Sequence, residues 1–155
     1  MQKSQFNRLI KEGFNHIPIS REIVVDTLTP LALYLKLANN PYSYFLESVQ
    51  GGEKWGRYSF IGLAAETVIK VNNYEIRVEK NGKLIQEYSV EDPLEWIKEY
   101  QDQFKVPQLD SLPDFNGGLV GYFGYEIVRY IEPKLSHINK TDELNVPDIL
   151  LMVSN

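Results

Sequence analysis

Apolar residues recur at helical spacing in three parts of the chain, separated by stretches in which apolar and polar residues alternate. Near the N-terminus, Phe6, Leu9 and Ile10 fall on one side of a helix predicted over residues 4–12, and Gly13 is placed to end it. Two further helices are predicted over residues 31–38 and from Asp92-Pro93 to about residue 105.

The second of these helices has a clear start signal. Thr29 is a favourable N-cap residue, and Pro30 suits the first helical position because its missing N–H is not needed there. Leu31 and Leu35 lie four residues apart, so the pattern predicts that they form one buried stripe.

Alternating and β-branched segments predict strands. They cover residues 17–25, 42–49, 57–61, 67–71, 74–79, 84–90 and 148–153. Asn81-Gly82 is a strong signal for a two-residue turn, which makes residues 67–90 an antiparallel meander. The predicted fold class is therefore α+β, with antiparallel β-sheets and flanking helices.

Two apolar stretches near the C-terminus carry further expectations. The glycines at 118, 121 and 124 match neither common phosphate-binding loop, so they indicate a strand in close contact with another backbone. The run Ile149–Val153 is continuously apolar, which is typical of a strand buried on both faces. If its partners are missing, this strand leaves an exposed seam, and the chain is expected to self-associate.

Composition narrows the class of protein. The 155 residues are 43% hydrophobic and 24% charged, as in a soluble globular domain, with no cysteine and a net charge of −5. The acidic balance argues against nucleic-acid binding, and no apolar run is long enough to cross a membrane. These features fit a cytoplasmic protein. The sequence shows no acid–base or metal-ligand constellation, so no catalytic residue is assigned.

The polar pair Glu47 and Ser48 ends one predicted strand and is the main candidate for binding chemistry. Neighbours on a strand point to opposite faces, so the two side chains cannot share one solvated face. One interpretation is a strand end that frays into a loop. The other is the polar corner of an apolar pocket, with a carboxylate for an ammonium group and a hydroxyl for a carboxylate or amide.

Three segments resemble the N-terminal region of the anthranilate synthase component I family of chorismate-utilising enzymes. Residues 45–62, FLESVQGGEKWGRYSFIG, are similar to its LLES…GRYSFIG signature, with Phe45 in place of the first leucine. Residues 117–129, GGLVGYFGYEIVR, resemble its GGLxGYxxYDxVR stretch. Residues 145–152, NVPDILLM, resemble its (D/N)xPDxxLM strand, and the three matches occur in the family's order.

The resemblance implies that residues 1–155 form the N-terminal domain of such an enzyme, one part of a two-layered α/β sandwich. The implied reaction converts chorismate and glutamine-derived ammonia to anthranilate and pyruvate in tryptophan biosynthesis. Ammonia would come from a glutamine amidotransferase partner, component II. The chorismate and Mg²⁺ site would lie in a C-terminal domain that is absent here, so this chain alone is expected to be inactive.

The resemblance also implies that the chain carries part of a feedback site for L-tryptophan. Leu46, Glu47 and Ser48 align with the family's LLES residues and would contact the ligand, while Arg57 and Tyr58 are weaker candidates. The alternatives are the N-terminal part of aminodeoxychorismate synthase component I or of an isochorismate-type enzyme, and a stand-alone amino-acid-binding module.

Overall fold

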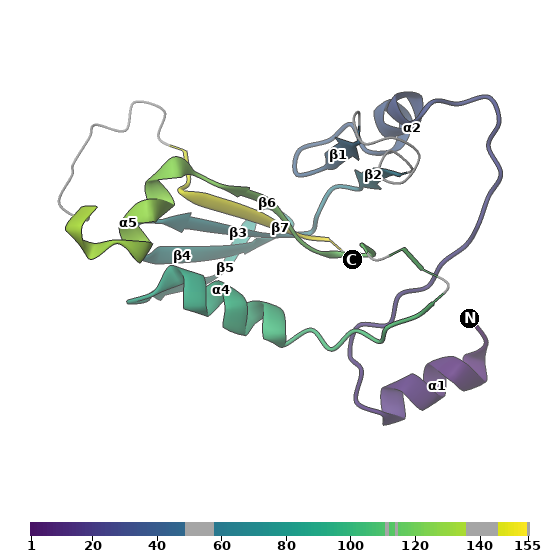
Figure 1. The fold of residues 1–155 in the computed structure, drawn as a ribbon, viewed down its shortest axis with the longest axis horizontal. Helices are drawn as coiled ribbons and strands as arrows, with labels where there is room; N and C mark the ends of the chain where they lie inside the picture. The colour runs from purple at the N-terminus through teal and green to yellow at the C-terminus, as the bar shows by residue number, and fades with distance from the viewer. Residues whose placement is uncertain (49–57, 111, 114, 136–145, 155) are drawn as a thin grey trace.

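The computed structural model describes residues 1–48, 58–110, 112–113, 115–135 and 146–154. Its centre is a five-stranded antiparallel sheet in the order β5-β4-β3-β7-β6 (Figure 1). The strands are β3 (Thr67–Asn72), β4 (Glu75–Lys80), β5 (Lys83–Ser89), β6 (Gly118–Phe123) and β7 (Ile149–Ser154). The α+β class is confirmed, and the described helices are too short and too polar to cross a membrane.

One face of this sheet holds the main core. Eight residues form it: Ile69, Val71, Ile76, Val78, Ile97, Ile149, Leu151 and Val153. Helix α4 (Pro93–Asp102) covers this face and contributes Ile97, and Tyr130 of α5 (Val128–Ile131) packs against the edge of the cluster. The carboxylate of Asp92 accepts hydrogen bonds from the first backbone N–H groups of α4, which confirms the predicted helix start.

The turns of the meander follow from residues that tolerate positive φ. Asn81 and Gly82 have φ values of 51° and 73°, as a two-residue hairpin turn requires, and Asn73 at 53° makes the turn between β3 and β4. The predicted hairpins are therefore confirmed.

Strand β7 lies inside the sheet, between β3 and β6. It pairs antiparallel with both neighbours, and Leu151 is only 2% exposed. The expectation that this apolar strand leaves an exposed seam is therefore wrong, because β3 and β6 complete its hydrogen bonding within the chain. Gly121 of β6 lies so close to the backbone of Leu150 that a Cβ would clash with its carbonyl oxygen, which confirms the close approach predicted for this glycine.

A second, smaller unit of structure lies beside the end of the large sheet. Strands β1 (Tyr44–Glu47) and β2 (Ser59–Gly62) form an antiparallel pair, and α2 (Pro30–Leu37) packs on it (Figure 1). The Thr29 hydroxyl oxygen accepts the Ala32 N–H at 3.2 Å, so the predicted cap is confirmed.

The predicted burial of α2 is wrong. Leu31 and Leu35 are 51% and 55% exposed, because the described residues provide no surface that packs against this stripe. The helical period correctly predicted the helix, but burial depends on a packing partner that the period does not specify.

The N-terminal part of the chain contains one confirmed element and one error. Helix α1 (Lys3–Lys11) forms as predicted, buries Leu9 and is followed by Gly13 at φ 93°. The strand predicted over residues 17–25 is absent, since this segment is extended but pairs with no described strand. Short 3-10 helices at Tyr125–Ile127 and Pro133–Leu135 flank α5.

Candidate functional site

The residues that the sequence singled out lie at the end of the β1–β2 hairpin where the chain passes from one strand to the other. Leu46 and Glu47 end β1, and the register places Glu47 opposite Ser59 at the start of β2. Ser48 and Tyr58 are the next residues outward on the two strands. Arg57 lies outside the described residues. The hairpin therefore brings four of the five predicted residues together.

Strand alternation divides these residues between two faces. Leu46 and Ser48 share one face, whereas Glu47 lies on the other face with Phe45. Phe45 stacks on Tyr34 of α2 with ring centroids 5.7 Å apart, which fixes the orientation of the hairpin against the helix. The hydroxyl of Ser59 donates to the Glu47 carboxylate at 3.3 Å.

The end of the hairpin is open to solvent. Leu46 is 48% exposed and Tyr58 is 52% exposed, and Glu47 and Ser48 are also on the surface. The end of β1 thus exposes an apolar side chain and a hydroxyl on one face and a carboxylate on the other, which are the kinds of group that an amino-acid site uses.

A hydrogen bond joins the hairpin to the large sheet. The hydroxyls of Tyr44 in β1 and Ser154 in β7 are 2.8 Å apart and partly buried. The Tyr44 ring lies against Gly62, where a Cβ would clash with it. A cavity of about 190 Å³ beside this contact is lined by the rings of Phe60 and Phe115, which meet edge to face at 5.0 Å. The hairpin thus has a defined position relative to β7.

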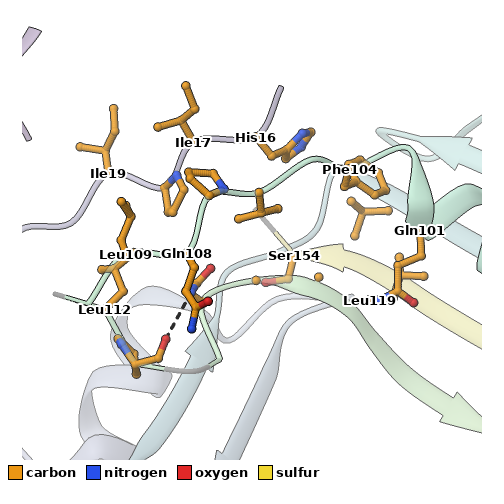
Figure 2. Close-up of a pocket in the computed structure, with 18 of the residues that line it drawn as sticks. His16, Ile17, Ile19, Gln101, Phe104, Gln108, Leu109, Leu112, Leu119 and Ser154 are labelled. Atoms are coloured by element: carbon orange, nitrogen blue, oxygen red, sulfur yellow. Dashed lines mark hydrogen bonds between the residues drawn. The ribbon is translucent and has the colours of Figure 1, made fainter. Parts of the chain in front are cut away.

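A larger groove of about 850 Å³ lies next to this cavity, with which it shares Ser154 (Figure 2). It is lined by residues 16–19, the end of α4, residues 106–110, 112–113 and 116–119, and the end of β7. Its wall is mainly apolar, and none of the predicted site residues lines it. His16 contributes a buried Nδ1 atom that has no hydrogen-bond partner among the described groups. Its ring packs edge to face on Phe104 at 4.7 Å.

Sequence reasoning did not predict this groove. Residues 106–115 carry two prolines, which predict a connection on the surface. Nothing in the sequence predicts that a groove lies between this connection and residues 16–19. The polar groups along the groove include the amides of Gln101, Gln108 and Asn116 (Figure 2). The imidazole of His16 and the carboxylate of Asp110 also line the groove.

Asp148 joins three parts of the sheet at the start of β7. Its carboxylate accepts the Tyr130 hydroxyl at 2.6 Å and the Asn73 backbone N–H at 2.7 Å, and its carbonyl oxygen accepts the Gly124 N–H at 2.7 Å. Burial, and then the bond to Asp148, raise the pKa of the Tyr130 hydroxyl. Each of these contacts ties one segment of the fold to another, so this cluster positions the sheet.

Metal binding finds no support in the parts of the chain that the structure describes. They contain no group of three or more histidine, aspartate or glutamate side chains arranged to hold an ion. The half-buried carboxylate of Glu79 is paired with Lys70 at 2.8 Å. The Mg²⁺ that the family resemblance implies is expected in the part of such an enzyme outside residues 1–155.

Comparisons with known proteins agree with the motifs. The chain is 52% identical over all its 155 residues to "Anthranilate synthase component 1" of Pseudomonas putida, and 50% identical over the same length to that of Pseudomonas aeruginosa. The protein of this name from Neisseria meningitidis is 45% identical over 99% of the chain. The matches cover 31% or 32% of these relatives. No family model matches the chain.

The fold and the comparisons together define an α+β domain homologous to part of a larger biosynthetic enzyme. The relatives are anthranilate synthase component 1 proteins, and the resemblance to the N-terminal region of that family is confirmed along the whole chain. The chain spans about a third of the length of the curated relatives it matches.

Proposed function

We propose that residues 1–155 serve as the N-terminal structural and regulatory domain of an anthranilate synthase component 1. The observation that carries the proposal is 52% identity along the entire chain to the Pseudomonas putida protein of that name. The whole enzyme would act as a lyase, converting chorismate and ammonia to anthranilate and pyruvate. Tryptophan biosynthesis is the route in which such an enzyme works.

The regulatory part of the proposal places an L-tryptophan contact at the open end of the β1–β2 hairpin. Glu47 has the charge to pair with the ligand's ammonium group, and the Ser48 hydroxyl suits its carboxylate. Leu46 offers exposed apolar surface to the indole ring. Tyr58 and Arg57 would border the site. The exposure of these groups supports a site completed by the rest of the enzyme.

Catalysis and its partners belong to the longer protein in this proposal. Chorismate and Mg²⁺ would bind in the two-thirds of the relatives that lie outside the match, and a glutamine amidotransferase, component II, would supply ammonia. The 155-residue chain alone is proposed to be inactive, and the enzyme to work in the cytoplasm. We also retain self-association of the isolated chain, now through its exposed apolar surface rather than through β7.

A chimera tests the proposal directly. Residues 1–155 replace the matched residues of the Pseudomonas putida protein, and anthranilate fluorescence is measured with chorismate, ammonia and Mg²⁺. The chimera should form anthranilate, and L-tryptophan should inhibit it. The 155-residue chain alone is the control and should give no signal above the blank.

Each part of the proposal has its own contrary outcome. A folded chimera without activity would contradict the structural role. An active chimera that ignores L-tryptophan would contradict the regulatory role and leave the structural role standing. Anthranilate formed by the isolated chain would contradict its assignment as a non-catalytic domain.

A further inference from the structure

The segment between α1 and α2 has the sequence of a strand and the exposure of an unpaired one. Residues 17–25 are extended, and Ile19, Ile23 and Val24 are 75%, 68% and 82% exposed. In Figure 1 the later part of this segment runs along the outside of the molecule to α2 with no strand beside it. Three large β-branched side chains in a row of nine are thus left in water.

The backbone of the segment is also unpaired. The N–H groups of Asn15 and His16 both bond to the carbonyl of Lys105, which fixes the beginning of the segment to the end of α4. The next backbone hydrogen bond along the chain is accepted by Thr29, at the start of α2. Between these anchors, the described residues supply the segment with no backbone hydrogen bond. A strand-length stretch is therefore anchored at both ends, while the described residues leave its backbone N–H and C=O groups without hydrogen-bond partners.

The side-chain pattern gives this stretch two different faces. Ile17, Ile19, Ile23 and Val25 fall on one face, with Arg21 among them. Pro18, Ser20, Glu22 and Val24 lie on the opposite face. One apolar face and one more polar face is the pattern of a strand at a sheet that is covered on one side. Proline removes one N–H at position 18, which suits the beginning of a strand or an edge position.

We propose that residues 17–25 become a β-strand paired with a strand edge in the part of an anthranilate synthase component 1 that lies outside the match. This inference rests on the proposed function. The relatives are about three times as long as this chain, so most of their length is available to supply the partner edge. Main-chain hydrogen bonds supply affinity in such strand addition, and the apolar face sets the register.

The two edges of the chain's own large sheet are the competing partners. Edge strand β5 carries Lys83 and Glu87, and such charges discourage pairing with another strand. Edge strand β6 carries no charged residue that would discourage pairing. Every copy of the chain has this edge, so the β6 edge of one copy is available to residues 17–25 of another. Pairing between copies is therefore the main rival outcome, and it predicts protection of the segment in the isolated chain at high concentration.

Amide hydrogen exchange of residues 17–25 distinguishes these outcomes. In the isolated chain at low micromolar concentration the amides should exchange at nearly the rate of an unstructured peptide. In the chimera with the Pseudomonas putida protein they should exchange on the order of 100-fold more slowly, because paired strand amides exchange only through opening. Equal rates in the two proteins would overturn the proposal. Protection that appears in the isolated chain as its concentration rises would also overturn it, in favour of a second copy.

A matched pair of substitutions tests the face that docks. Ile23→Lys places a charge on the apolar face, and Ser20→Lys places the same charge on the opposite face of the same segment. In the chimera, Ile23→Lys should remove most of the protection, whereas Ser20→Lys should retain it. Circular dichroism of both variants as isolated chains should be unchanged, since neither residue is buried there. Equal loss of protection in both variants, or in neither, would contradict the assigned face.

The exchange result and the activity result are independent. A chimera that makes anthranilate while residues 17–25 exchange freely would overturn the strand and leave the proposed function intact. A chimera with a protected segment but no anthranilate formation would overturn the proposed function and leave the strand intact.

Discussion

The five-stranded sheet and the β1–β2 hairpin with α2 differ in how far they bury their apolar residues. Seven apolar residues of the sheet pack with Ile97 of α4 in one core, and the inner strand β7 is paired on both sides. In the smaller unit, α2 buries none of its residues, and β1 becomes exposed toward Leu46 and Glu47. The polar pair with candidate binding chemistry lies on the less complete unit.

This difference separates the roles of the two regions. A sheet with its own core can hold its shape without further chain, because burial of apolar surface is the main stabilising contribution to a fold. The hairpin has its position from Tyr34, Tyr44 and Ser154, but one of its surfaces remains open. We therefore attribute stability to the sheet, whereas the proposed ligand contact falls on the hairpin.

The largest expected effect comes from placing a charge in the sheet. Leu151→Lys buries an unpaired ammonium in the core of β7, which should cost more than about 4 kcal/mol and unfold most of the protein. Circular dichroism and thermal melting measure the loss. Leu35→Lys in α2 is the matched control. Because Leu35 is already exposed, the melting temperature of this variant should change little. A folded Leu151→Lys variant would contradict the central position of β7.

The next effect concerns the carboxylate at the start of β7. Asp148→Ala leaves the Tyr130 hydroxyl and the Asn73 N–H without their acceptor. An unpaired donor costs about 1–3 kcal/mol when buried. The Tyr130 hydroxyl is partly buried whereas the bond to Asn73 is exposed, so urea denaturation should show a loss of roughly 1–3 kcal/mol in unfolding free energy. A loss below about 0.5 kcal/mol, the usual range for a surface substitution, would show that the cluster is not structural.

The same cluster predicts a pH dependence at alkaline pH. The pKa of Tyr130 is raised in the folded protein, so the unfolded chain loses this proton first. Its contribution to stability is complete below the ordinary tyrosine pKa of about 10 and is lost as the pH rises above that value. Tyr130→Phe should flatten this part of the stability profile. An equally steep decline in the variant would show that other groups cause the loss of stability at alkaline pH.

A smaller, local effect is expected at the hairpin. In the chimera, Ser48→Ala should weaken inhibition by L-tryptophan by roughly 10- to 150-fold, because a hydrogen bond to a charged group contributes about 1.5–3 kcal/mol. Uninhibited activity should stay near normal. Ser20→Ala is a control outside the hairpin and should leave inhibition unchanged. Unchanged inhibition in Ser48→Ala would return this residue to the role of a polar strand end.

Local signals in the sequence predicted the elements of the fold well. The Thr29 and Asp92 caps, the Asn81-Gly82 turn and the apolar run of β7 are all local features of the sequence, and all are confirmed. The close approach at Gly121 was predictable for a similar reason, since a glycine in a strand indicates contact with another backbone.

Burial and pairing between distant segments were predicted less well. The stripe of Leu31 and Leu35 and the strand over residues 17–25 have the right patterns but no partner among the described residues. The exposed seam expected at β7 was also wrong, because no local pattern shows that β3 lies on one side of this strand and β6 on the other. At the site, the pair Glu47 and Ser48 was found from its polarity alone.

The central claim is that the hairpin forms one wall of a tryptophan site that the rest of the enzyme completes. Calorimetric titration with L-tryptophan tests it most directly, with the isolated 155-residue chain and the chimera measured side by side. The account predicts strong binding to the chimera and weak or undetectable binding to the isolated chain. Equally tight binding to both would show that the described hairpin and its neighbours already hold the whole site, and would contradict the claim.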